Sequence, residues 1–548
     1  MPNNKLTITN AEMISAIETH GGIRPAAAAL GIGESTIRMR LKKSVHEILQ
    51  KDGSEHQIEF TFGSTLPPKP VIFEPLPDRT RYFILTAAQD DSAVHEDFWK
   101  CLNVYAEWLE DCEIIVAGFA YSKKLFQDME TRSSKIGFHP LIDAFVMHDR
   151  VLIGDGLAFC AEANTQPTAV RPLSGFTTYT KERWGVFPHV KVALESVPTM
   201  KNEPAKQIMT TGAVTLPNYI RMKAGVKAMF HHVCGAVLVE LAPDGTFWCR
   251  HLLATDFEDG AFHDLDCRIT RDGVSEGHRV EALTYGDIHH EKLDPVVAKM
   301  TWGYDVARQR VDPQFASLVN FLQPNFEFYH DLSDFTPRNH HAIKDHHFRF
   351  VMHEQGTDNV EAALRGCAVF LKETTRHRYD VQAIVVESNH DQALVKWLKT
   401  ADYRDDQENA QFFLKMQMLY YSYLAAGNTA PPVFEHFLKE VGCPKDIEFV
   451  NEDQSFTICG GIECGMHGHL GANGARATPM QFAKAGARSN TGHTHSPQII
   501  DGAYVAGVSG KLDMGYNKGP SSWAHAHIVT YPNGKRAILT MSNGRFFG

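Results

Sequence analysis

Residues 489–497 read S-N-T-G-H-T-H-S-P, and they decide how the C-terminal half of the chain is interpreted. His493 and His495 stand two residues apart, directly after Gly492. In an extended backbone, side chains two residues apart point to the same side. Both imidazoles can then reach one divalent metal ion, or each can bind one of two adjacent ions. A G-H-x-H motif alone is weak evidence, so a metal site requires further ligands elsewhere in the chain.

Residues with metal-ligand chemistry follow several predicted strands upstream. Ligands at the carboxyl ends of successive strands are what an open α/β sheet offers to a metal or a small molecule. The G-H-T-H motif is therefore the last of five such positions. The upstream residues are Asp287 and His289 after the apolar run 280–283, Asp331 after 326–328, Asn389 and His390 after 381–387, and His467 after 456–459.

This order of motifs resembles the calcineurin-like metallophosphoesterase superfamily over about residues 279–548. The resemblance implies an α/β fold of layered β-sheets flanked by helices, with a centre of two divalent metal ions. It also implies that Asp331 bridges the two ions and that His390 is the acid beside the leaving group. The ligands that the resemblance implies are Asp287, His289, Asp331, Asn389, His467, His493 and His495.

The sequence departs from the family pattern in two places. His330 and Ser388 stand where the second and third motifs usually have glycine. Both are expected to be loop positions rather than ligands, so the departures concern the local backbone. The fourth motif, H-G-H, leaves His467 and His469 as alternatives, and the family pattern favours His467. Asp334 is expected to orient a ligand histidine rather than to bind metal.

The ligand types predict the metal and the reaction. Nitrogen and oxygen ligands without thiolate suit manganese, iron or zinc, and we expect manganese. Two such ions about 3.5–4 Å apart can supply a hydroxide nucleophile near neutral pH and clamp the oxygens of a phosphoryl group. The expected activity is therefore hydrolysis of a phosphate ester.

Composition limits the class of protein. The 548 residues are enough for two to four domains. The net charge of −11 excludes a protein that coats nucleic acid through bulk charge. Ten cysteines without a C-x-x-C motif fit reduced thiols in a cytosol. The N-terminus does not resemble a signal peptide, and no apolar run approaches the ~20 residues of a membrane helix. We expect a soluble cytoplasmic protein without membrane contact.

Residues 1–50 predict a small all-α unit. The stretch 26–43, A-A-A-A-L-G-I-G-E-S-T-I-R-M-R-L-K-K, resembles a helix-turn-helix of the Fis type. The resemblance implies that helix 34–43 enters a DNA major groove. A helical oligomerisation or docking module is the alternative. The residues expected to contact DNA are Ser35, Thr36, Arg38, Arg40, Lys42 and Lys43.

The remaining chain divides into three further parts. Residues 51–79 form a proline-rich linker. Residues 80–278 begin with a β-α-β pattern at 82–87, 95–109 and 112–119 and continue with short strand-like runs, among them 189–194; their role stays open. Residues 279–548 form the phosphoesterase domain. The insertion 335–359 is rich in basic residues and histidine, which fits either a solvated loop or a lip that contacts a polyanionic substrate.

A DNA-binding unit tethered to a phosphoesterase favours a deoxyribonuclease. The whole chain loosely resembles phage-encoded metallophosphoesterase nucleases, including the early host-DNA-degrading nucleases of T-odd siphophages. That resemblance implies manganese-dependent hydrolysis of DNA in the host cytoplasm. Two alternatives are a small-molecule phosphodiesterase or phosphatase, and a DNA-binding regulator with a relic phosphoesterase domain; the complete ligand set argues against the relic. The sequence leaves a homo-oligomer open.

Overall fold

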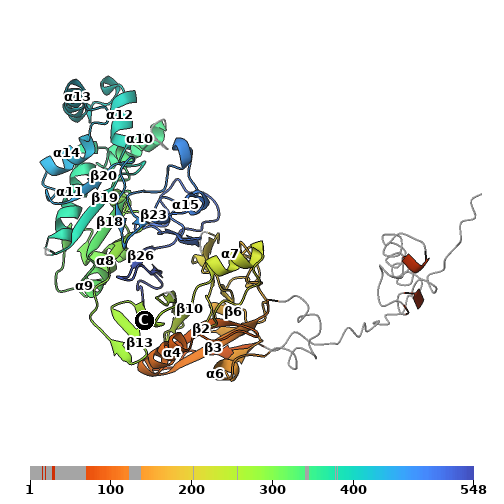
Figure 1. Ribbon diagram of the computed structural model, residues 1–548. Coiled ribbons are helices and arrows are strands. Elements are labelled where there is room, and N and C mark those ends of the chain that lie inside the picture. The colour runs from red at the N-terminus through yellow and green to blue at the C-terminus, as the bar shows by residue number, and fades with distance from the viewer. Residues whose placement is uncertain are drawn as a thin grey trace, which may run out of the picture. The chain divides into compact units, whose positions relative to one another are not determined.

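The computed structural model describes residues 70–548 apart from 122–136, 201–202, 256, 340–344, 377 and 379, and also residues 15, 16, 19 and 28–30. The chain divides into two compact units, Met1–Pro67 and Pro68–Gly548. The residues predicted to contact DNA, from Ser35 to Lys43, lie outside the described residues. The second unit is a mixed α/β structure with several sheets (Figure 1). No helix in the described part of the chain is long and apolar enough to cross a membrane.

A six-stranded sheet forms the centre of the C-terminal half. Its first four strands are parallel, and β26 joins β15 in antiparallel orientation. The parallel strands are apolar on both sides because both faces of the sheet are covered. In order across the sheet the strands are β20 (Glu448–Val450), β19 (Gln382–Val386), β18 (Phe326–His330), β15 (Ala282–Thr284), β26 (Ala526–Thr530) and β27 (Arg536–Thr540).

Helices cover one face of this sheet (Figure 1). Leu283, Tyr329 and Val385 point from the strands into a core that these helices complete. Helix α11 has apolar residues at helical spacing on its inner face, and the side chain of Asn359 caps it by accepting from Ala362 N. The helices are α8 (Pro295–Trp302), α9 (Leu318–Leu322), α11 (Val360–Thr375), α12 (Ala393–Thr400), α13 (Ala410–Ala425) and α14 (Val433–Glu440).

An eleven-stranded sheet packs on the opposite face. Ala282, Phe328 and Ile384 meet Ile458 and Ile462 of this second sheet in a shared apolar core. Its strands, in order, are β1 (Val71–Phe73), β5 (Val151–Ile153), β6 (Leu157–Phe159), β7 (Trp184–Phe187), β9 (Lys206–Thr210), β8 (Leu194–Val197), β24 (Gln498–Ile500), β25 (Ala503–Val505), β23 (Arg488–Thr491), β22 (Ile462–Glu463) and β21 (Thr457–Ile458).

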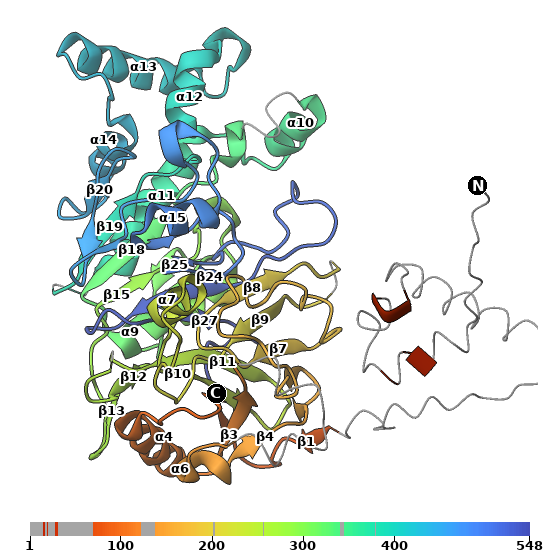
Figure 2. The ribbon, with the colours of Figure 1, turned by 45° about the vertical axis from the view of Figure 1, so that its right-hand side comes forward.

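Two distant parts of the sequence share this eleven-stranded sheet. Strand β8 pairs with β24 in antiparallel register, with Leu194 opposite Ile499. Residues 71–210 therefore continue the sheet that residues 457–505 begin, and Figure 2 shows β8 beside β24. The predicted strand at 189–194 is wrong, because His189 Nδ1 accepts a hydrogen bond from Lys191 N and the chain turns there. The strand begins only at Leu194.

A five-stranded sheet contains the predicted β-α-β unit. Its order is β11 (Phe247–Leu253), β10 (Gly235–Leu241), β2 (Arg81–Gln89), β3 (Cys112–Phe119) and β4 (Val146–Met147). Strands β2 and β3 are parallel, as predicted, and α4 (Glu96–Leu109) connects them. Phe83 and Leu85 face a core that also contains Ile528 and Ile538, so this sheet packs against the β26–β27 end of the six-stranded sheet.

The described part of the basic insertion contains a helix and a buried arginine. Asp345 caps helix α10 (His346–Glu354) by accepting from His347 N and Phe348 N. Arg338 is only 4% exposed and forms ion pairs with Asp358 and Asp406. Both ion pairs lie inside the protein, so Arg338 does not contribute to a lip that contacts substrate.

Candidate metal centre

The carboxyl ends of three neighbouring parallel strands converge at one edge of the six-stranded sheet. Asp287 follows β15, Asp331 follows β18 and Asn389 follows β19. The backbone φ is positive at His289 and Asp331, and also at His493 and His495. Residues other than glycine seldom adopt this conformation, and such strain clusters at functional sites. The fold thus holds these side chains in positions that the local backbone alone would not favour.

Two carboxylates and three imidazoles form the middle of the cluster. His495 Nε2 lies 3.1 Å from Asp287 Oδ2 and 3.0 Å from His289 Nε2. Asp331 Oδ2 lies 3.5 Å from His289 Nε2 and 3.4 Å from His467 Nε2. Asp287, His289, Asp331 and His495 each offer one ligand atom within 4.8 Å of the others, and all four are buried. The G-H-T-H and D-x-H motifs therefore meet, as predicted.

The remaining predicted ligands lie at the margin of this cluster. The ring of His493 lies 5.2 Å from the ring of His467, measured between centroids. The backbone N–H of His493 donates to Asp287 Oδ2 over 2.7 Å. Asn389 contributes a buried side-chain oxygen. Asp287, His289, Asp331 and Asn389 thus follow strands of the six-stranded sheet, as expected. The other three predicted ligands lie in loops after β22 and β23 of the eleven-stranded sheet, so the centre is shared between two sheets; they are His467, His493 and His495.

Buried polar atoms without a hydrogen-bond partner gather here. Each such atom costs about 1–3 kcal/mol unless something pairs with it. The chemistry of this set, carboxylate and amide oxygens with imidazole nitrogens, fits a divalent cation. Among the described residues, the unpartnered atoms of this region include Asp287 Oδ1, His289 Nδ1, both ring nitrogens of His330, Asp331 Oδ1, Asp334 Oδ1, Asn389 Oδ1, both ring nitrogens of His467 and Nδ1 of His495.

The two histidines of the H-G-H motif have different partners. His467 is fully buried against Asp331, whereas His469 Nε2 lies 2.8 Å from Glu452 Oε1. Burial opposes the charged form of His467, but the carboxylates of Asp331 and Asp287 outweigh it and raise the pKa to about 9. His467 therefore faces the carboxylates of the centre, whereas His469 pairs with Glu452, with its ring centroid 5.4 Å from that of His467.

Asp334 and His390 stand beside the cluster. Asp334 Oδ1 lies 3.3 Å from His289 Nδ1, which agrees with the expected role of Asp334 in orienting a histidine. His390 Nδ1 donates to the backbone oxygen of Asp334 over 3.1 Å. Burial lowers the pKa of His390, but Asp331 and Asp334 outweigh burial and raise it above the ordinary value. His390 therefore lies next to the centre beside two carboxylates that favour its protonated form.

Two further acids, to which the motif analysis gave no role, accept hydrogen bonds from the loop that follows Asp331. Glu291 accepts from Ser333 Oγ and Asp334 N, and Asp391 accepts from Ser333 N. Burial raises the pKa of each of these carboxyl groups to about 7. The signal that could have identified them is their place in the sequence: Glu291 follows His289 by two residues, and Asp391 follows His390 directly. Trp523 had no such signal, although its ring centroid lies 4.2 Å from that of His495.

His527 on β26 fixes the backbone immediately before Asp287. Its Nδ1 accepts from Gly286 N over 3.0 Å, and its Nε2 lies 2.9 Å from Thr301 Oγ1. Nδ1 must stay unprotonated to accept from an N–H, so only the neutral ring fits. Burial lowers the pKa of His527 to about 3. The D-x-H loop therefore depends on a histidine that does not titrate in the folded state near neutral pH.

His527 should make the protein less stable in acid. Below pH 6.5, the ordinary pKa of histidine, the unfolded chain takes up a proton that the folded chain refuses. The contribution of His527 to the free energy of unfolding is therefore complete above that pH. It is lost as the pH falls toward about 3, by about 1.4 kcal/mol for each pH unit. Urea unfolding between pH 7 and 5 should show a shallower pH dependence for His527→Asn than for the unsubstituted protein. The exposed-site variant His436→Asn should keep the original slope, and equal slopes for all three proteins would contradict the prediction.

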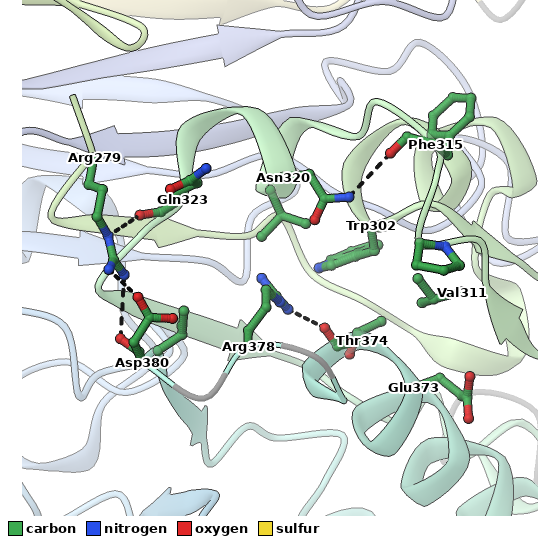
Figure 3. Close-up of a pocket in the computed structure, with 13 residues that line it drawn as sticks. Arg279, Trp302, Val311, Phe315, Asn320, Gln323, Glu373, Thr374, Arg378 and Asp380 are labelled. Atoms are coloured by element: carbon green, nitrogen blue, oxygen red, sulfur yellow. Dashed lines mark hydrogen bonds and ion pairs between the residues drawn. The ribbon is translucent and has the colours of Figure 1, made fainter. Parts of the chain in front are cut away.

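A separate cavity of about 490 Å³ lies at the opposite ends of the same strands (Figure 3). Arg279, Gln323 and Asp380, which line it, precede β15, β18 and β19. Arg279 pairs with Asp380 and donates to Gln323 O, as Figure 3 shows. Arg378 pairs with Glu327. The charges of this cavity are thus already matched, and none of the predicted site residues lines it.

Comparison with known proteins finds a relative that covers most of the chain. Protein A1 of Escherichia phage T5 is 40% identical over 475 residues, which are 85% of this chain and 82% of protein A1. No family model matches the chain. No solved structure matches it.

Proposed function

The chain belongs to the family of protein A1 of Escherichia phage T5, and we propose that it is a metal-dependent phosphodiesterase that hydrolyses DNA. One observation carries the proposal: Asp287 and Asp331 are buried among His289, His467 and His495 at the carboxyl edge of a parallel sheet. The five motifs that supply these residues follow the order of the calcineurin-like metallophosphoesterases.

Two divalent cations fit the unpartnered atoms of the centre. Asp287, His289, Asp331 and His495 would hold them together with Asn389, His467 and His493. Manganese suits these nitrogen and oxygen donors, as do iron and zinc. When bound, such ions supply a nucleophile near neutral pH and neutralise charge on the phosphoryl oxygens.

The residues of the chain would supply the proton for the leaving oxygen. His390 donates from Nδ1 to the carbonyl of Asp334, and its doubly protonated form would carry the second proton on Nε2. The neighbouring Asp331 and Asp334 favour this protonated form. Positioned beside the scissile bond, His390 would act as the general acid. Asp334 would fix the ring of His289 through Nδ1.

DNA is the substrate that the rest of the chain favours. The stretch 26–43 resembles a helix-turn-helix and would supply DNA contacts through Arg38 and Arg40. The relation to a phage protein agrees with action in the cytoplasm of an infected host. A small phosphodiester or phosphomonoester is the alternative substrate, and DNA cleavage assays separate the two.

The decisive experiment is DNA cleavage by metal-stripped protein with and without added manganese. We expect degradation of linear and circular double-stranded DNA only with the metal, and cleavage of circles would show endonuclease activity. His493→Ala should lower the rate by about 10²-fold or more, because His493 is a proposed ligand beside His467. The exposed His436 serves as the matched control, and His436→Ala should cleave normally.

Turnover of a small phosphodiester without cleavage of DNA in any metal would replace the nuclease by a small-molecule phosphoesterase. Tight DNA binding without any metal-dependent turnover would favour a DNA-binding regulator. Equal activity of His493→Ala and His436→Ala would show that the centre described above is not the active site.

A further inference from the structure

A groove crosses the eleven-stranded sheet between α15 (Pro479–Ala485) and α7 (Lys223–His231), which Figures 1 and 2 both place near each other. It consists of two adjoining cavities of about 730 Å³ and 280 Å³. Lys191, Ile499 and Asp501 line both cavities, so the two lie side by side. The metal centre contributes no residue to either cavity.

Positive charge without a matching acid lines this groove. Arg171, Lys484 and Arg488 are exposed, and within the described residues none of them has a hydrogen-bond or ion-pair partner. The described residues that line the groove include two acids, Glu195 and Asp501, and Glu195 lies near enough to Arg171 for the two charges to interact. Asp501 is already paired with Lys191 and lies 3.4 Å from a ring nitrogen of His231. On a chain of net charge −11, this excess of positive charge is local, and it fits an anionic partner.

Arg536 strengthens the same conclusion from inside the groove. Its side chain is 5% exposed and donates to the backbone oxygens of Ser489 and Gly502 and to Asn490 Oδ1. Among the described residues no carboxylate pairs with it. A second guanidinium, that of Arg488, lies near enough to lower its pKa further after burial. Because its N–H groups already donate within the protein, Arg536 adds positive charge to the lining and leaves direct contact with a phosphate to the exposed Arg488.

Aromatic side chains accompany the charge. Phe230, near the end of α7, lines the smaller cavity and is 83% exposed. Tyr504 lines the same cavity, and the guanidinium of Arg536 lies 4.0 Å from its ring centroid. An exposed ring beside cationic side chains is the combination that binds single-stranded nucleic acid, because bases stack on the ring while phosphates meet the charges.

The groove leads toward the metal centre along the sheet. Gln498 lines the larger cavity and follows His495 by three residues, so their Cα atoms are at most about 10 Å apart. Arg488 stands at the other end of β23, four residues before Gly492. A bound strand would thus run from the far end of the sheet to the edge that carries the cluster.

We propose that this groove binds a single strand of nucleic acid through its phosphates and a base stacked on Phe230. The charge of the groove alone indicates an anionic ligand. That this anion is nucleic acid, rather than another polyanion, rests on the proposed nuclease function. The groove would hold substrate by contacts that the metal centre does not provide. Such contacts would also explain how an acidic chain retains a polyanion.

The test measures binding by the metal-free full-length protein, so that cleavage does not interfere. A fluorescein-labelled 12-nucleotide DNA strand is titrated and followed by anisotropy at several salt concentrations. Lys484→Glu combined with Arg488→Glu should weaken binding by about tenfold or more and lower the slope of log K against log salt by about two. The charge-matched control, Lys372→Glu with Lys396→Glu on α11 and α12, should bind like the unsubstituted protein.

Two further measurements fix the position and the ligand. A strand that carries 5-iododeoxyuridine should photo-crosslink to the peptide containing Phe230, and crosslinks confined to residues 1–50 would overturn the proposal. Equal affinities of the groove variant and the control would also overturn it. Inorganic phosphate and unlabelled oligonucleotide are then compared as competitors of the labelled strand. If phosphate competes as strongly as the oligonucleotide, the groove is a simple anion site and strand binding is refuted. Failure of the nuclease itself is distinguishable, since it would abolish cleavage and leave this binding unchanged.

Discussion

Replacing Asp331 by asparagine should abolish metal-dependent hydrolysis, with a loss on the order of 10³-fold or more. Asp331 is 1% exposed, and its carboxylate lies between His289 and His467. An asparagine keeps the size but removes the negative charge that a pair of cations requires. Several kilocalories of charge stabilisation in the transition state are thereby lost, and about 4 kcal/mol corresponds to 10³-fold in rate.

Metal binding gives a readout of Asp331→Asn that does not depend on activity. The unsubstituted protein should unfold at a higher temperature with manganese than without it, because a ligand at 100 times its Kd stabilises the folded state by about 2.7 kcal/mol. Asp331→Asn should lose most of this increase while keeping the same circular dichroism. Asp446→Asn changes an exposed acid and serves as the control. A full manganese-dependent increase in Asp331→Asn would refute the role of Asp331.

The sequence predicted the part of the centre that depends on strand ends. Strand β19 alternates between two buried faces, with Val385 in the helix-side core and Ile384 in the core between the sheets. Such an apolar run bounded by Asn389 is recognisable from local sequence. Because parallel neighbours end at the same edge, the predicted ligands Asp287, Asp331 and Asn389 converge without further information.

The remaining features depend on contacts between distant residues. The pairing of β8 with β24 joins residues 303 and 305 positions apart, and no local pattern encodes which edges meet. The support of Gly286 by His527 and the packing of Trp523 on His495 arise in the same way. His330 also departs from expectation: it ends β18 as a buried strand residue rather than a loop position. The residues predicted to contact DNA lie outside the described part of the chain, and their role stays a prediction.

Gly492 shows how closely the loop that carries His493 and His495 approaches Asp287. A Cβ atom at this position would lie 2.1 Å from Asp287 Oδ1, far inside van der Waals contact. The carboxylate cannot move away cheaply, because its Oδ2 accepts from His493 N and lies 3.1 Å from His495 Nε2. Gly492→Ala must therefore displace either Asp287 or the loop that carries His493 and His495.

We expect Gly492→Ala to lower metal affinity and DNA cleavage by about 10²-fold or more, since displacements near 1 Å already cost this much in a catalytic site. Raising the manganese concentration should recover part of the rate, because the ligands are misplaced rather than removed. Gly137→Ala is the matched control, since its Cβ would have its nearest contact at 3.5 Å. Asp331→Asn should not recover at any manganese concentration. Normal metal affinity in Gly492→Ala would mean that Asp287 is free to rotate away, and would argue against its place in the metal centre.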